Sequence, residues 1–204
     1  MPGKLIISLD FELMWGVRHR IRGNEYNDAL LGGRKAIPEI LRLFERYGIR
    51  ATWATVGLLF ARSRKEMLRY MPDIEPEYMN NAFDNYNAVR HLIGENETQD
   101  PLHYGRSLID LVAESGGQEI ATHTFSHYYC LESGQTLEAF GADIDASIAI
   151  ARAAGHEIQS IVFPRNQYSD NHIKVCAARG IFAFRGQPPG FAYRPMVNRD
   201  VGRV

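Results

Sequence analysis

Short apolar segments alternate with amphipathic helical segments along this chain, and this alternation restricts the fold more than any other feature. Residues 5–9 (LIISL) are rich in Ile and Leu, which is typical of a strand buried on both faces. Residues 32–49 then place apolar side chains at helical spacing, with charged residues between them. Residues 50–57 are again typical of a strand. Strand, helix and strand in this order predict a right-handed βαβ unit in a parallel α/β sheet.

The alternation resumes after a different kind of segment. Residues 60–105 are polar, carry several aromatic side chains and show no clean strand, although stretches near 63–71 and 84–93 fit helices. We interpret this segment as an insertion in a single domain spanning residues 1–204, because long ordered insertions often form lids or binding loops. Beyond it we expect helices in 105–116, 136–155 and 170–180, and strands starting at residues 118, 158 and 181.

Composition narrows the class of protein. Of 204 residues, 45% are hydrophobic and 23% are charged, which is ordinary for a globular domain. The net charge of −1 argues against a basic surface for nucleic acid or anionic lipid. We expect no membrane span, because no apolar run approaches the ~20 residues that one needs. The first ten residues lack the features of a signal peptide, so we expect a cytoplasmic protein.

Chemically reactive side chains follow three of the five expected strands, and the carboxyl ends of parallel strands meet at one edge of a sheet. Asp10 and Glu12 end the first strand and share one face, because side chains alternate along a strand. Two carboxylates on one face repel each other, and a divalent cation or an arginine would relieve that repulsion. The alternative is that Glu12 lies past the strand in solvent.

The sequence His-Thr-Phe-Ser-His places His123 and His127 four residues apart. If the backbone is helical there, both imidazoles face one side and can bind one metal. This spacing alone is a weak signal, but here it follows an apolar strand directly. Two histidines and a carboxylate with open water positions are typical of a catalytic metal site. Arg165, after the fourth strand, could hold a carboxylate in its ionised form, or could simply lie at the surface.

Four segments together resemble the NodB-type polysaccharide deacetylases: SLDFE, RATWATVG, GGQEIATHTFSH and VFPRNQYS. The resemblance covers about residues 4–186 and is greatest to the branch with a Phe-Pro-Arg-Asn-Gln motif. It implies a partly open, irregular (β/α) barrel of about seven strands. Because the sequence shows five strands and then a Pro/Gly-rich tail, we expect the barrel to be incomplete at its C-terminus, with its last strands lost.

The resemblance also implies a reaction, the removal of an acyl (acetyl) group from an N-acylated sugar or polysaccharide precursor. Carried over, His123, His127 and Glu12 would bind a divalent metal, often Zn²⁺ in the family. Asp10 would be the general base on a metal-bound water, and Arg165 would orient and ionise it.

Here Asp-x-Glu replaces the family's Asp-Asp, so the two carboxylates could exchange roles, and the family's histidine general acid has no counterpart in this sequence. A cytoplasmic location would favour a small or lipid-linked substrate. The alternatives are a hydrolase of non-sugar C–N bonds, such as a ureide or cyclic amide, and a non-catalytic carbohydrate-binding relative. The sequence does not indicate an oligomeric state.

Overall fold

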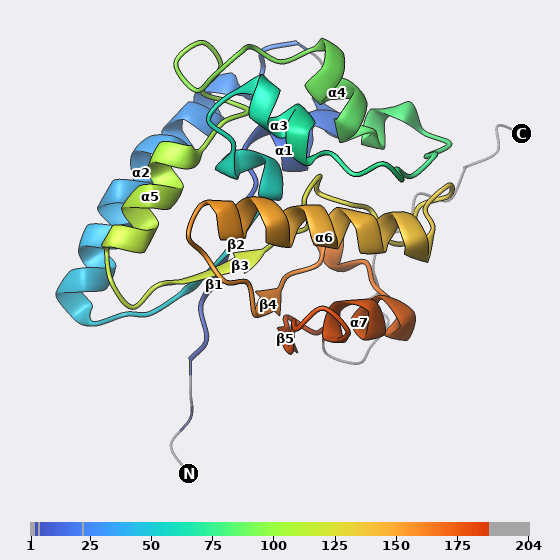
Figure 1. The fold of residues 1–204 in the computed structure, drawn as a ribbon. Helices are drawn as coiled ribbons and strands as arrows, with labels where there is room; N and C mark the ends of the chain where they lie inside the picture. Colours follow the sequence, from blue (N-terminus) through green and yellow to red (C-terminus); the bar gives the residue numbers. More distant parts are fainter. Residues whose placement is uncertain (1–2, 4, 22, 188–204) are drawn as a thin grey trace, which may run out of the picture.

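The computed structural model describes residues 3, 5–21 and 23–187, and its centre is a single parallel sheet (Figure 1). The sheet curls into half a barrel, with helices around it, so the expected α/β class and barrel type are confirmed. Its strands follow one another in chain order, which is what successive βαβ units produce. These strands are β1 (Ser8–Phe11), β2 (Thr52–Thr55), β3 (Glu119–Thr122), β4 (Ser160–Ile161) and β5 (Ala183–Phe184).

A helix that packs against the sheet follows each of the first four strands before the next one begins. In Figure 1 helices α2 and α5 pack side by side on one flank of the sheet, and α6 lies against α7 on the other. These helices are α2 (Asn27–Tyr47), α5 (Arg106–Glu114), α6 (Leu137–Ala153) and α7 (Asp170–Ala177).

Shorter helices and 3-10 turns lie in the connections between these elements. In Figure 1 α1, α3 and α4 gather at the top of the molecule. Both α3 and α4 lie in the 60–105 segment, where sequence periodicity predicts two helices. The short elements are α1 (Met14–Val17), η1 (Arg18–Arg20), η2 (Gly57–Phe60), α3 (Arg64–Tyr70), η3 (Asn81–Phe83), α4 (Asn85–His91) and η4 (Pro164–Asn166).

The first strand begins later than its apolar run predicts. Leu5 and Ile6 are 87% and 84% exposed, and pairing with β2 starts only at Ser8, opposite Thr52. A strand extends only as far as a neighbouring strand supplies hydrogen bonds, so the paired residues set its ends. The fourth and fifth strands are only two residues long for the same reason.

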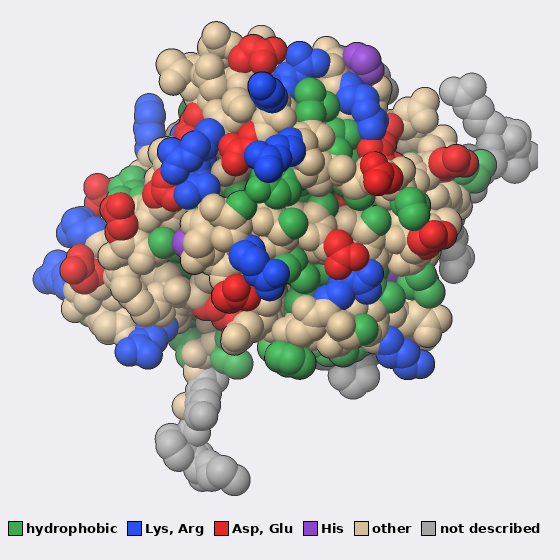
Figure 2. Space-filling view, in the orientation of Figure 1, with side chains coloured by type: hydrophobic (Ala, Val, Ile, Leu, Met, Phe, Trp, Pro, Cys, Tyr) green, Lys and Arg blue, Asp and Glu red, His purple; other side chains and the backbone are tan. Residues whose placement is uncertain are grey.

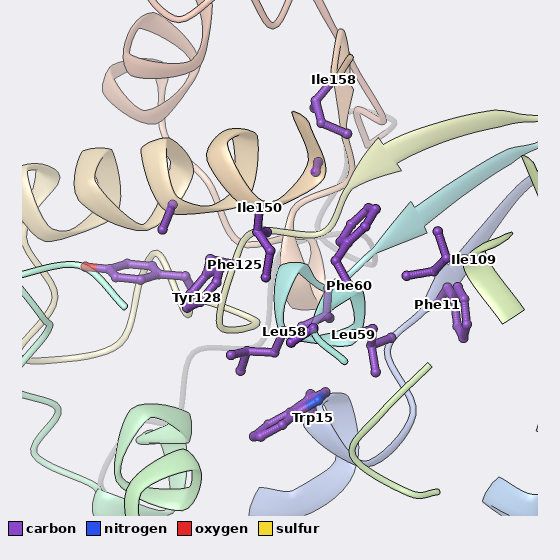
Figure 3. Close-up of a cluster of buried hydrophobic side chains, with 14 of the residues drawn as sticks. Phe11, Trp15, Leu58, Leu59, Phe60, Ile109, Phe125, Tyr128, Ile150 and Ile158 are labelled. Carbon is purple, nitrogen blue, oxygen red and sulfur yellow. The ribbon is translucent and has the colours of Figure 1, made fainter. Parts of the chain in front are cut away.

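The main hydrophobic core lies between the sheet and the helices and continues under the turn that follows β2 (Figure 3). Trp15, Phe60 and Phe125 come from three different connections, and each is at most 1% exposed. In Figure 3 the η2 residues Leu58 and Leu59 lie between Trp15 and the side chains above them. The connections at this end of the sheet are therefore packed as tightly as the sheet, which holds the residues they carry in fixed places.

The surface carries charges of both signs. Lys and Arg side chains alternate with Asp and Glu over the face shown in Figure 2. Within the residues that the structure describes, no helix is both long enough and apolar enough to cross a membrane.

Candidate metal centre

The side chains of Glu12, His123 and His127 meet at the carboxyl end of the sheet. Oε2 of Glu12 lies 3.0 Å from Nε2 of His127 and 3.3 Å from Nε2 of His123. One ligand atom from each residue falls within 4.8 Å of the others. Both histidines are buried and Glu12 is 27% exposed, so the alternative of a solvated Glu12 does not describe this structure.

The hydrogen bonds of His123 show which of its nitrogens is free. Nδ1 lies 2.7 Å from the carbonyl oxygen of Val162, and because a carbonyl only accepts, Nδ1 must carry the proton. The lone pair of Nε2 then faces the Glu12 carboxylate, and Nε2 has no hydrogen-bond partner. A buried lone pair beside a carboxylate is favourable only with a cation or a proton between them.

The distances from Glu12 to the two histidines fit a Zn²⁺ ion. Zn–N and Zn–O bonds of about 2.0–2.1 Å in a tetrahedron place neighbouring ligand atoms about 3.3 Å apart. The carboxylate oxygen of Glu12 lies at 3.0 and 3.3 Å from the two imidazole nitrogens. Two imidazoles and one carboxylate are also a donor set that this metal prefers in catalytic sites.

The pKa values of Glu12 and His127 are shifted towards the forms that bind metals. Burial alone would raise the pKa of Glu12, but its close contacts with His123 and His127 outweigh burial and hold that pKa well below its usual range. Burial lowers the pKa of His127, although Glu12 partly opposes this. At neutral pH the carboxylate is therefore ionised and His127 is neutral, as metal ligation requires.

A strained loop, rather than a helix, brings the two histidines together, so the helical condition considered for them in the sequence is not met. The strand β3 ends at Thr122, and residues 123–129 form no helix. Thr124 and His127 have φ of 64° and 59°, a left-handed conformation that is costly for side chains with a Cβ. We call residues 123–127 the histidine loop.

Asp10 lies two residues before Glu12, but its partner is not the arginine expected from the sequence. Both oxygens of Asp10 accept hydrogen bonds from Arg185, at 2.8 and 2.9 Å. Arg165 instead pairs with Glu132 at 3.0 Å. The strand β4 ends before residue 164, and φ is 54° at Arg165 in the turn that follows, so strand alternation no longer decides where this side chain lies.

Comparison with known proteins identifies the family of the chain. The sequence pattern of the family described as polysaccharide deacetylase matches residues 25–183, which is most of the chain. The chain belongs to the polysaccharide deacetylase family. The matched residues include His123, His127 and Arg165, whereas Asp10, Glu12 and Arg185 lie outside them. None of the curated proteins compared with the chain matches it.

Solved structures share the fold of this polysaccharide deacetylase domain at low identity. A Mycobacterium smegmatis protein described as a polysaccharide deacetylase has 15% identity and a TM-score of 0.52, over 86% of this chain and 48% of its own. IcaB from Ammonifex degensii has 13% identity and a TM-score of 0.50, over 90% and 60%. A mutant of a CE4 family pseudoenzyme from Bacillus anthracis has 11% identity and a TM-score of 0.50, over 91% of this chain and 45% of its own. The chain thus spans about half the length of these structures.

Sequence reasoning missed residues that shape the centre. Arg185 lies one residue past the fifth strand, so the rule that reactive residues gather at strand ends could have found it. Asp143 lies on α6 three residues after Phe140 and one before Ile144, both buried, so a carboxylate on an apolar helix face was the available signal. Gly16 carried no such signal, because its importance depends on how Glu12 folds over it.

Proposed function

We propose that this protein is a metal-dependent hydrolase that removes an acyl group, such as acetyl, from an N-acylated sugar or polysaccharide precursor. The observation that supports this most is the meeting of Glu12, His123 and His127 in a chain of the polysaccharide deacetylase family. These three residues would hold a divalent metal, with Zn²⁺ favoured by the donor set.

When bound, Zn²⁺ lowers the pKa of a bound water towards ~7 and polarises the acyl oxygen. Glu12 is the better ligand of the two carboxylates, because its Oε2 contacts both histidines. Asp10 is left to act as general base. Its two hydrogen bonds from Arg185 fix the orientation of the carboxylate, so that it can accept a proton from the attacking water.

The first test compares the two carboxylates. Glu12→Ala should lose Zn²⁺ affinity, because a ligand is removed. Asp10→Asn should keep the metal and lose turnover by about 10²–10⁴, the usual contribution of a positioned base. Zn²⁺ affinity by chelator competition and acetate release from N-acetyl sugars measure the two properties. The reverse pattern would exchange the two roles, and a wild-type protein that cannot be loaded with any divalent ion would falsify the proposal.

The substrate class needs a panel of compounds. We propose a small or lipid-linked sugar precursor, in keeping with the cytoplasmic location expected from the sequence. Release of acetate from such sugars supports a deacetylase, whereas ring opening of a ureide or cyclic amide would support the alternative hydrolase. Metal binding with sugar affinity but no hydrolysis would instead indicate a non-catalytic carbohydrate-binding relative.

A further inference from the structure

The histidine loop needs external support, because two of its residues have the left-handed backbone described above. Part of this support comes from the turn η2. The backbone N–H of Gly57 donates to the carbonyl of Thr124 at 2.9 Å, and the N–H of Leu58 donates to that of Phe125 at 3.0 Å. These bonds hold the loop on the side of β2.

Further support comes from the carboxylate of Asp143 on α6. This side chain is fully buried and accepts hydrogen bonds from the N–H of Phe125 at 2.6 Å, the N–H of Ser126 at 3.1 Å and the hydroxyl of Ser126 at 2.6 Å. The Tyr86 hydroxyl donates a fourth hydrogen bond. Each of these donors is uncharged, and a buried carboxylate that relies on neutral donors is costly.

The 60–105 segment reaches the same loop directly. Tyr86 on α4 binds Asp143, and its ring stacks on that of Phe125 at 6.3 Å. The neighbouring Asn85 is buried, and its amide donates to the carbonyl of Ser126 at 2.8 Å and to that of Trp15 at 3.2 Å. One end of α4 therefore contacts both the histidine loop and the residues that follow Glu12.

We propose that Asp143 and Tyr86 are positioning residues for the metal centre, through which the 60–105 segment fixes the spacing of His123 and His127. The inference rests on the proposed function in one respect, that these histidines bind the metal. Neither residue touches the ligands themselves. Asp143 acts by fixing two of the backbone N–H groups between the histidines, those of Phe125 and Ser126, and Tyr86 acts by fixing Asp143.

The chain offers variants with matched controls. Asp143→Asn replaces one acceptor oxygen with an amide that faces N–H donors, and Tyr86→Phe removes a single hydroxyl. The control for Asp143→Asn is Asp145→Asn, the same substitution two residues further along α6. The carboxylate of Asp145 pairs with Arg179. The control for Tyr86→Phe is Tyr104→Phe. It also removes the hydroxyl of a buried tyrosine in the 60–105 segment, but this hydroxyl donates to the carbonyl of Gly94 and not to Asp143.

Two measurements on metal-loaded protein test the proposal: Zn²⁺ affinity by chelator competition, and the visible absorption spectrum of the Co²⁺-substituted protein, which reports ligand geometry. Asp143→Asn should weaken Zn²⁺ binding about 10- to 100-fold, the range found for residues that orient metal ligands. Tyr86→Phe should weaken it less, and both should change the Co²⁺ spectrum. The control variants should match the wild type in both measurements.

A third measurement needs no metal. Hydrogen exchange at the N–H groups of Phe125 and Ser126 should be faster in the two test variants than in the controls. Failure of the wild type to bind metal would overturn the proposed function, while this measurement would still decide whether Asp143 and Tyr86 hold the loop. Unchanged exchange, or a lower melting temperature with wild-type affinity and spectrum, would overturn the inference. If Asp143→Asn does not fold, Tyr86→Phe alone decides.

Discussion

At the scale of single residues, Gly16 sets the position of the Glu12 carboxylate. A Cβ at residue 16 would lie 1.9 Å from Cδ of Glu12, so any larger residue must push that carboxyl group away. We expect Gly16→Ala to weaken Zn²⁺ binding about tenfold or more, although no ligand is changed. Gly32→Ala on α2 is the control, because its Cβ meets nothing within 4 Å. Chelator competition on both variants checks this, and equal affinities would show that Glu12 can move without loss.

The pairing of Asp10 gives a second prediction at this scale. Arg185→Ala removes both hydrogen bonds that orient Asp10, whereas Arg165→Ala leaves them intact. At equal Zn²⁺ content, Arg185→Ala should therefore lower kcat about tenfold or more, up to the 10²–10⁴ that a positioned base contributes. Steady-state rates of acetate release by the two variants measure the difference. A larger decrease of kcat in Arg165→Ala than in Arg185→Ala would indicate that Arg165 orients Asp10.

How far the sequence predicts the centre depends on where regular structure ends. Glu12 and His123 each lie one residue past a strand, so strand periodicity still places them. Arg165 lies beyond the end of β4 in a left-handed turn, where that periodicity no longer applies. Asp143 and Tyr86 are far from the ligands in sequence, and only tertiary packing brings them to the histidine loop.

At the scale of elements, the start of α7 depends on a neutral histidine. Nδ1 of His172 accepts hydrogen bonds from the N–H and hydroxyl of Ser169, which precedes the helix. Burial lowers the pKa of His172 to about 4, from an ordinary value of 6.5. Between these values the unfolded chain binds the proton and the folded chain does not, so stability falls as the pH falls from 6.5 to 4.

This linkage is worth up to roughly 3 kcal/mol, at about 1.4 kcal/mol for each pKa unit. His172→Gln cannot take up the proton, so it should lose less free energy of unfolding than the wild type between neutral pH and about pH 4. Urea unfolding of both proteins at the two pH values measures the difference. Because His19 also has a pKa lowered to about 4, both proteins will lose some free energy of unfolding as the pH falls. The test is therefore the difference between the two losses. Equal losses would contradict the role of His172.

The helices were easier to predict than the strands. Helix α2 ends at Tyr47, where Gly48 adopts a left-handed φ of 63°, and the sequence marks that end with the glycine itself. No residue in the apolar run at 5–9 marks the start of β1, because it depends on which residues of β2 lie opposite. A helix end that a glycine marks is a local property, whereas a strand end is a property of the sheet.

At the scale of the whole molecule, the half-barrel has two edges, β1 and β5, that pair on one side only among the residues described. Phe182, just before β5, is 80% exposed, and Phe184, within β5, is 42% exposed. Exposed apolar side chains along an edge strand favour association with other chains. The five strands themselves can be predicted from the sequence pattern. Whether the outer sides of β1 and β5 are paired cannot, because that depends on which other segment lies beside them.

We therefore expect this 204-residue chain to self-associate as its concentration rises, and Phe182→Lys to reduce that association, because a charge on an edge strand disfavours pairing with another chain. Leu92→Lys is the control, since Leu92 is 65% exposed but follows α4, away from the sheet edges. Sedimentation velocity over a range of concentrations measures the effect. A wild-type chain that stays monomeric throughout, or an equal effect of both substitutions, would show that the β5 edge does not drive association.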